Sequence, residues 1–183
     1  MEKSITILND VDVTVDGLSL KVKGPMGEIS KSFDDPRYCD IKIAKDGNNI
    51  SISYLGEDRK SFAMIGTIHA HLRNMMHGVT TGYVYEMKVI FKHFPMTVSV
   101  KAGNIEVKNF LGEKSIREVP VIGKAEVKID KENITVSGID IEEVAQTAAN
   151  IERACKLRGR DRRIFQDGIY ITTRHTSKGV VHG

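Results

Sequence analysis

The sequence predicts an α+β protein made of two copies of one small domain, each a mainly antiparallel β-sheet packed against one α-helix, followed by a basic C-terminal extension. Short segments in which apolar and polar residues alternate recur through both halves, and a helical pattern closes each half. Two segments of the first half, 20–28 and 49–53, return about 85 residues later as 105–113 and 133–137. A period that appears twice in the same order indicates a tandem duplication.

The first half is expected to be β-structure before its helix. Valine alternates with aspartate and threonine over 11–15, which places the valines on one side of a strand. Turn signals follow at 16–17, at 24–28 and at 46–48, where glycine occurs with aspartate, proline or asparagine. The expected strands cover 5–15, 18–23, 29–33, 41–43 and 50–54.

The second half repeats this order. Alternating segments are expected as strands over 87–91, 98–100, 105–108 and 133–137. The boundary between the halves falls near Thr80-Thr81-Gly82. The predicted domains are therefore 1–81 and 82–183, and the second includes an extension over about 159–183 that has no counterpart in the first.

One helix is expected at the end of each domain. Apolar residues recur at helical spacing in both segments, and Asp140 with Glu143 resembles a capping pair. Glycine follows each pattern and is the usual residue that ends a helix. The expected helices are 62–77, with Ser61 as N-cap and Gly78 as stop, and 141–158, with Asp140 as N-cap and Gly159 as stop.

Composition restricts the class of protein. The chain has 183 residues, of which 40% are hydrophobic, so it can form one domain or two small ones. No segment approaches the roughly 20 apolar residues of a membrane span, and the N-terminus does not resemble a secretory signal. The two cysteines, Cys39 and Cys155, form no C-x-x-C motif, which fits a reducing compartment. We expect a soluble, cytoplasmic protein with no membrane partner.

Charge is distributed unevenly along the chain. The segment 153–183, the basic segment, contains eight lysines and arginines and two acids, whereas the preceding 152 residues contain 19 and 22. This asymmetry predicts a polyanionic partner, because the guanidinium fork of arginine matches phosphate oxygens. A solvated helix end is the alternative interpretation, but it does not explain why so few acids are interleaved.

No catalytic or metal-binding pattern is present. His69 and His71 are two residues apart on a predicted helix and so point to different faces, which is unsuitable for a zinc pair. The sequence lacks a G-x-S-x-G motif and the glycine-rich phosphate-binding loops. Cys155 occupies an apolar position of the second helix and is expected to be a small buried hydrophobe. We expect no enzyme activity, no cofactor, no metal and no small-molecule substrate.

The candidate binding residues lie in the basic segment. Arg153, Lys156 and Arg158 also suit the negative end of a helix dipole, so part of this charge has a structural explanation. Phe165 and Tyr170 offer stacking surfaces for unpaired bases. In the alternative, Ile164, Phe165, Ile169 and Ile171 form a last strand; we favour this for the two later isoleucines and leave Phe165 open. The predicted RNA-binding residues are Arg153, Lys156, Arg158, Arg160, Arg162, Arg163, Phe165, Arg174, His175 and Lys178.

The sequence resembles the L-six family of large-subunit ribosomal proteins in its archaeal and eukaryotic form. The resemblance rests on VDGLSLKVKGPMGE at 15–28, HLRNMMHGVTTGY at 71–83 and DRRIFQDGIYI at 161–171, and it covers essentially the whole chain. It implies a duplicated α+β fold and a structural role in the ribosome. The bacterial form has a lysine- and glycine-rich motif where this chain has RGRDRRIFQDG at 158–168, so individual bacterial RNA contacts are not transferred.

The resemblance also implies partners. Members of the family bind large-subunit ribosomal RNA near the sarcin–ricin loop and the stalk base, mainly through the second domain and its extension, and they lie among other ribosomal proteins. The expected function is therefore that of an RNA-binding structural protein of the ribosome. A protein–protein adaptor whose basic segment binds an acidic partner is the main alternative. The last residues, 176–183, are expected to be a flexible tail that becomes ordered on a partner.

Overall fold

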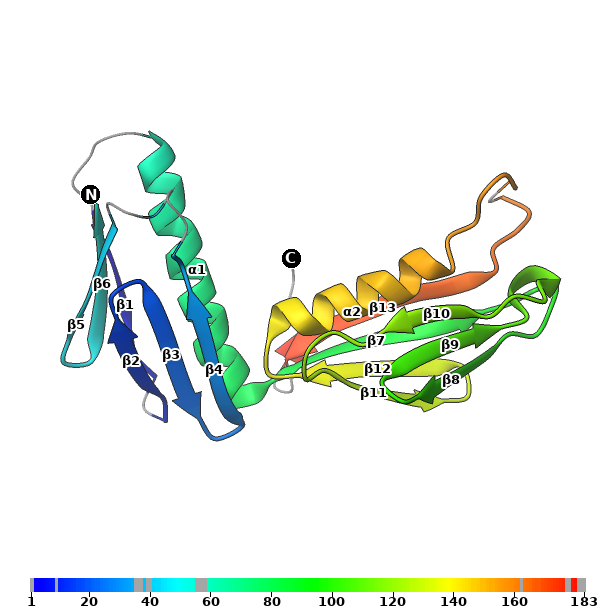
Figure 1. Ribbon diagram of the computed structural model, residues 1–183, viewed down its shortest axis with the longest axis horizontal. Coiled ribbons are helices and arrows are strands. Elements are labelled where there is room, and N and C mark those ends of the chain that lie inside the picture. Colours follow the sequence, from blue (N-terminus) through cyan, green and yellow to red (C-terminus); the bar gives the residue numbers. More distant parts are fainter. Residues whose placement is uncertain are drawn as a thin grey trace. The chain divides into compact units, whose positions relative to one another are not determined.

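The predicted α+β duplication is confirmed (Figure 1). The computed structural model describes residues 2–8, 10–34, 38, 41–54, 59–161, 163–176 and 179–180. The chain divides into two compact units, Met1–Thr81 and Gly82–Gly183. Every strand pairing among the described residues is antiparallel, and each unit carries one α-helix. No helix in this described part is long and apolar enough to cross a membrane.

Unit 1 contains two three-stranded sheets and the helix α1 (Arg59–Thr81). The first sheet has the order β1 (Glu2–Thr6), β6 (Asn49–Tyr54), β5 (Ile41–Asp46), and the second has the order β2 (Asp12–Asp16), β3 (Ser19–Gly24), β4 (Gly27–Ser32). Alternation places every second residue against α1. The fully buried side chains include Leu20, Val22, Ile50, Ile52, Ile65, Ile68 and Leu72. Cys39 lies outside the described residues.

The helix α1 is longer than predicted at both ends. Ser61 lies inside the helix rather than at its N-cap, and Gly78 does not end it. The last turn continues because Val79 is buried and because the hydroxyl of Thr80 donates to the carbonyl of Met76 at 3.0 Å. The glycine that ends the helix is Gly82, whose φ of 68° is left-handed.

Unit 2 has the same arrangement with one main addition. One sheet has the order β10 (Arg117–Pro120), β9 (Asn104–Lys108), β8 (Thr97–Lys101), and the short 3-10 helix η2 (Phe110–Gly112) precedes β10. The other has the order β11 (Glu126–Asp130), β12 (Asn133–Gly138), β7 (Tyr83–Ile90), β13 (Gly168–Thr176), β14 (Gly179–Val180). The helix α2 (Ile141–Ala154) closes the core.

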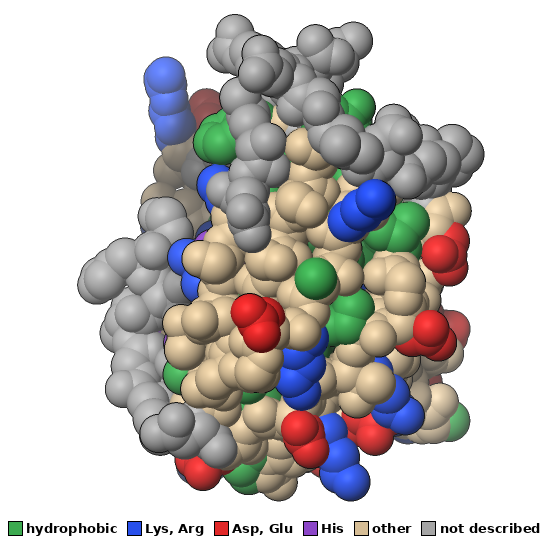
Figure 2. All heavy atoms as spheres, turned by 90° about the vertical axis from the view of Figure 1, so that its left-hand side faces the viewer, with side chains coloured by type: hydrophobic (Ala, Val, Ile, Leu, Met, Phe, Trp, Pro, Cys, Tyr) green, Lys and Arg blue, Asp and Glu red, His purple; other side chains and the backbone are tan. Residues whose placement is uncertain are grey.

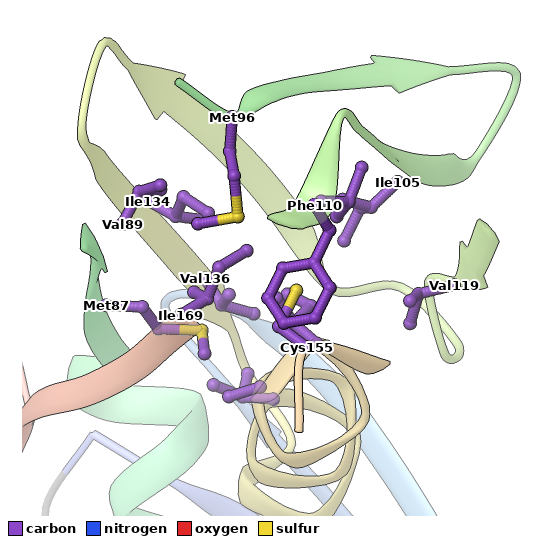
Figure 3. Close-up of a cluster of buried hydrophobic side chains, with 14 of the residues drawn as sticks. Met87, Val89, Met96, Ile105, Phe110, Val119, Ile134, Val136, Cys155 and Ile169 are labelled. Carbon is purple, nitrogen blue, oxygen red and sulfur yellow. The ribbon is translucent and has the colours of Figure 1, made fainter. Parts of the chain in front are cut away.

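The core of unit 2 joins both sheets and α2 (Figure 3). Met87, Ile134 and Ile169 come from three neighbouring strands, while Phe110 follows β9 and Cys155 follows α2. Cys155 is 3% exposed, and burial raises the pKa of its thiol to about 11. The prediction of a small buried hydrophobe at this position is confirmed.

The added element is the strand β13. In unit 1, β1 pairs with β6, and in unit 2, β7 pairs in the same way with β12. The other edge of β7 carries β13, which has no counterpart among the described strands of unit 1. The non-repeated end of the chain is therefore partly a sheet strand. Ile169 and Ile171 belong to this strand as predicted, whereas Ile164 and Phe165 precede it.

The helix α2 ends earlier than predicted. It stops at Ala154 and not at Arg158, and the side chain of Arg117 caps this end by donating from Nη1 to the carbonyl of Ala154 at 2.5 Å. The side chains of Cys155 and Leu157 then turn into the core. The arginine therefore satisfies one of the carbonyls that a helix end leaves without a partner.

The N-cap of α2 is the predicted Asp140, but the capping box is not formed. The Asp140 Oδ1 accepts from the amide of Glu142 at 2.9 Å. The carboxylate of Glu143 accepts instead from the amide of Lys124 at 2.8 Å, so it binds the loop before β11. At the end of the chain, β14 pairs with His175 and Thr176, so part of the tail expected to be flexible is a short strand.

Candidate nucleic-acid interface

A groove of about 650 Å³ lies where α2 ends. Its cationic lining consists of Arg153, Lys156, Arg158 and Arg160 from the end of α2 and the following segment, together with Arg117 of β10. The opposite wall is formed by η2 and β10 and includes Phe110, Leu111, Val119 and Pro120. We call this the basic groove. Four of the predicted RNA-binding residues are thus brought together.

The charge of the basic groove is only partly compensated. Arg117 donates to both oxygens of Glu113, at 2.7 and 3.0 Å, and its Cζ lies 4.2 Å from the ring centre of Phe110. Arg117 is thus a structural cation. Glu118 is the other acid of the lining, and no ion pair is formed by Arg153, Lys156, Arg158 or Arg160 with a described carboxylate. These four exposed side chains give the groove a net positive charge.

Other surfaces of the molecule have a different charge pattern. Figure 2 shows one face on which the acidic and basic side chains of the described residues are interspersed. Surface ion pairs such as Lys21–Glu28 at 2.7 Å and Lys108–Glu106 at 3.2 Å also occur in the β-sheets. Mixed charge of this kind is the ordinary pattern of a solvated surface. The clustered cations at the end of α2 are therefore the better candidate for binding an anion.

A buried carboxylate, that of Asp167, fixes the part of the basic segment just before β13. Asp167 is 1% exposed and accepts hydrogen bonds from the amides of Lys92 at 2.6 Å and His93 at 3.1 Å. Its second oxygen lies 2.7 Å from Nδ1 of His93. Burial opposes ionisation of the carboxyl, but these hydrogen bonds outweigh it and lower the pKa of Asp167 to about 2. The segment is thereby tied to the loop that follows β7.

Phe165 contacts two polar side chains of this region. Its ring centre lies 4.7 Å from that of His93, with an interplanar angle of 33°. The guanidinium carbon of Arg160 lies 4.9 Å from the same ring centre. Asp161 forms a turn with Phe165, because its carbonyl accepts from the amide of Phe165 at 2.9 Å. Phe165 therefore supports other side chains and is itself only half exposed.

Arg174 and His175 lie away from the basic groove. In the pairing of β13 with β7, Gly168 is opposite Ile90 and His175 is opposite Val84. A rise of about 3.3 Å per residue separates the two ends of β13 by roughly 20 Å. The fold thus divides the predicted residues into a groove set (Arg153, Lys156, Arg158 and Arg160) and a distal pair (Arg174 and His175).

A β-bulge between Ile171 and Thr173 sets the direction of the distal pair. The hydroxyl of Thr172 donates to the carbonyl of Glu86 at 3.0 Å, and Arg174 then stands opposite Tyr85. The Cζ of Arg174 lies 5.9 Å from the Tyr85 ring centre. A shift of one residue exchanges the faces of a strand, so the bulge determines which face Arg174 occupies.

The remaining predicted residues have varied positions. Arg163 is exposed next to Asp161, whose carboxylate accepts from the Arg163 amide at 2.9 Å. Tyr170 is 39% exposed on β13. Arg162 and Lys178 lie outside the described residues.

Sequence reasoning missed three residues that shape the site. Arg117 is 36 residues before Arg153 in the chain, and nothing in its surroundings indicates that it reaches the end of α2. Asp167 and His93 form a pair across 74 positions. The one available signal was that Asp167 is one of only two acids in the basic segment.

The fold and the groove define a duplicated α+β protein with a basic groove at the end of its second helix. The family model described as ribosomal protein L6 matches residues 9–82 and 94–168, one range in each unit. The chain belongs to this family. It is a family of ribosomal proteins and not of enzymes.

Curated relatives are similar over nearly their whole length. A protein of Desulfurococcus amylolyticus is 46% identical over 171 residues, which are 92% of each chain. A protein of Staphylothermus marinus is 46% identical over 172 residues, also 92% of each chain. A protein of Methanothrix thermoacetophila is 42% identical over 172 residues, 94% of this chain and 96% of its own. All three are named large ribosomal subunit protein uL6.

Proposed function

We propose that this protein is a structural constituent of the large ribosomal subunit and binds ribosomal RNA through the basic groove and the segment that follows it. The observation that carries the proposal is the cluster of Arg153, Lys156, Arg158 and Arg160 around one groove, without a described carboxylate paired to any of them. The names of relatives at 42–46% identity support the same conclusion. The protein acts in the ribosome, in the cytoplasm, without catalysis or a cofactor.

Phosphate neutralisation is the source of the affinity. Each cation that meets a phosphate releases condensed counterions, so RNA binding weakens as the salt concentration rises. The groove set contacts one stretch of RNA backbone, and Arg163 extends it along the same segment. Arg174 and His175, roughly 20 Å away along β13, contact a second stretch. Arg162 and Lys178 complete the proposed contact set, and Phe165 contributes to it by supporting Arg160, whose guanidinium carbon lies 4.9 Å from its ring centre.

The family resemblance gives the proposed location. Family members bind near the sarcin–ricin loop and the stalk base of the large subunit, among neighbouring ribosomal proteins. A compact domain with one basic region at the end of α2 and another on β13 suits a position where separate RNA segments meet. The sheets hold the two basic regions at a fixed distance from each other. This fixed spacing is the structural contribution of the protein.

The test is co-sedimentation with the large ribosomal subunit at moderate salt, with nuclease treatment as a second arm. We expect the protein to sediment with the large subunit and not with the small one, and nuclease to release it. Retention on an acidic protein after nuclease treatment would instead identify an adaptor. Point variants are needed to locate the contact, because truncation after Gly159 would also remove β13 and its buried Ile169.

A further inference from the structure

The ring of Phe165 already has two packed neighbours. His93 lies 4.7 Å away between ring centres, and the guanidinium carbon of Arg160 lies 4.9 Å from the ring centre. Arg160 is exposed, whereas Phe165 is half-buried against the core of unit 2. The guanidinium of Arg160 is therefore a more accessible planar group for a ligand than the phenyl ring.

We propose that the exposed plane of the Arg160 guanidinium receives one unpaired base of the bound RNA. This inference rests on the proposed function and specifies the kind of contact made at this position. A guanidinium plane stacks on bases as aromatic rings do, and an unpaired base offers the free face that such stacking needs. Phe165 is then the support for Arg160 and does not contact the base itself.

The stack is held in place before RNA binds. Asp167 fixes the backbone of Lys92 and His93 with hydrogen bonds of 2.6 and 3.1 Å, and it contacts the His93 ring at 2.7 Å. The turn at Asp161 fixes the backbone of Phe165. A long side chain that is already packed loses less conformational entropy on binding. Asp167, His93 and Phe165 are thus positioning residues for Arg160.

Charge distribution supports a nucleic acid as the ligand of this stack. Arg158 and Lys156 line the same groove as Arg160, and they can neutralise the phosphates on either side of the stacked base. An arginine that stacks through its plane keeps its N–H edge for a phosphate or a base edge. A lysine at position 160 would keep the positive charge but would lose the plane.

The experiment compares arginine-to-lysine variants at matched positions. Arg160→Lys, Arg158→Lys and Arg73→Lys all keep the net charge, and Arg73 is an exposed residue of α1 outside the proposed interface. Each full-length variant is bound to purified large-subunit ribosomal RNA, and every base is probed chemically in the complex. The affinity is measured at one fixed salt concentration, and circular dichroism checks that each variant is folded.

We expect Arg160→Lys to weaken binding about tenfold, which corresponds to about 1.4 kcal/mol, because the variant loses the stacking contact with one base. At least one unpaired base that the wild type protects should become reactive in this variant, while Arg73→Lys behaves as the wild type. Phe165→Leu should expose the same base, since it removes the support and keeps an apolar side chain. Asp167→Asn should expose it in part.

Two results would overturn the inference, and they differ in meaning. If Arg160→Lys and Arg158→Lys weaken binding equally and no base becomes reactive, Arg160 contacts phosphate only, and the proposed function still holds. If the wild type protects no base and does not bind large-subunit RNA, the proposed function fails and the stacking site fails with it.

Discussion

Asp167 illustrates how one residue can order a basic segment. It is nearly fully buried, and its two oxygens bind two amides and the His93 ring on the loop after β7. A buried carboxylate is unfavourable unless it is hydrogen-bonded, and here the hydrogen bonds are sufficient to keep it ionised. Asp167 thus holds the basic segment against the loop after β7.

The lowered pKa of Asp167 predicts how stability depends on pH. The folded value of about 2 lies below the ordinary 3.8, so the stabilisation is present above pH 4 and is lost as the pH falls toward 2. It amounts to about 2 kcal/mol. Urea unfolding between pH 2 and pH 5 should show this loss in the wild type and a smaller one in Asp167→Asn. Equal pH dependence in both proteins would exclude the role assigned to this carboxylate.

Arg117 has a structural role that the exposed cations of the same groove do not share. It binds Glu113, the carbonyl of Ala154 and the face of Phe110. Arg117→Met should lower the free energy of unfolding by about 1–3 kcal/mol, because it leaves the Glu113 carboxylate and a helix carbonyl without their partner. Arg158→Met is the control and should have little effect on stability. Chemical denaturation of both variants measures the difference.

The helix ends show what sequence patterns can and cannot predict at the level of elements. The apolar positions Val144, Ala148 and Ile151 are all fully buried, so periodicity located the inner face of α2 correctly. The ends were wrong, because they depend on contacts from distant residues. Arg117 caps α2 at Ala154, four residues before the predicted end, and α1 continues past Gly78 to the buried Val79. A glycine that ends a helix can be recognised from the neighbouring sequence, whereas a contact such as that of Arg117 with Ala154 joins residues far apart in the chain.

Two glycines of this helix region should respond in opposite ways to the same substitution. Gly82 has a left-handed φ of 68°, so Gly82→Ala should destabilise the protein by about 1 kcal/mol. Gly66 lies inside α1 with room for a Cβ, whose nearest neighbour would be Nζ of Lys3 at 3.8 Å. Gly66→Ala should stabilise by up to about 1 kcal/mol. Thermal unfolding of the two variants tests the assignment of Gly82 as the end of the helix.

At the scale of the whole molecule, a duplicated scaffold carries one added strand. Repeated segments predicted the two α+β copies, since each copy has the same strands and helix in the same order. All the predicted RNA-binding residues lie in the basic segment, but β13 separates Arg174 and His175 from the groove. Sequence order does not reveal strand register, and a bulge such as that at Thr172 changes which face a residue occupies. The groove also includes β10 and η2, which are distant from the basic segment in the sequence, so the order of residues alone does not predict it.

The central claim is that the cations of the basic groove bind ribosomal RNA by neutralising phosphates. The direct measurement is the affinity for large-subunit RNA as a function of salt concentration, for the wild type and two double variants. Lys156→Ala with Arg158→Ala removes two groove cations, and Lys124→Ala with Lys128→Ala removes two exposed cations elsewhere in unit 2. The groove variant should reduce the slope of log affinity against log salt by about 1.5, whereas the control should leave it unchanged. Equal slopes for the wild type and the groove variant would contradict the claim.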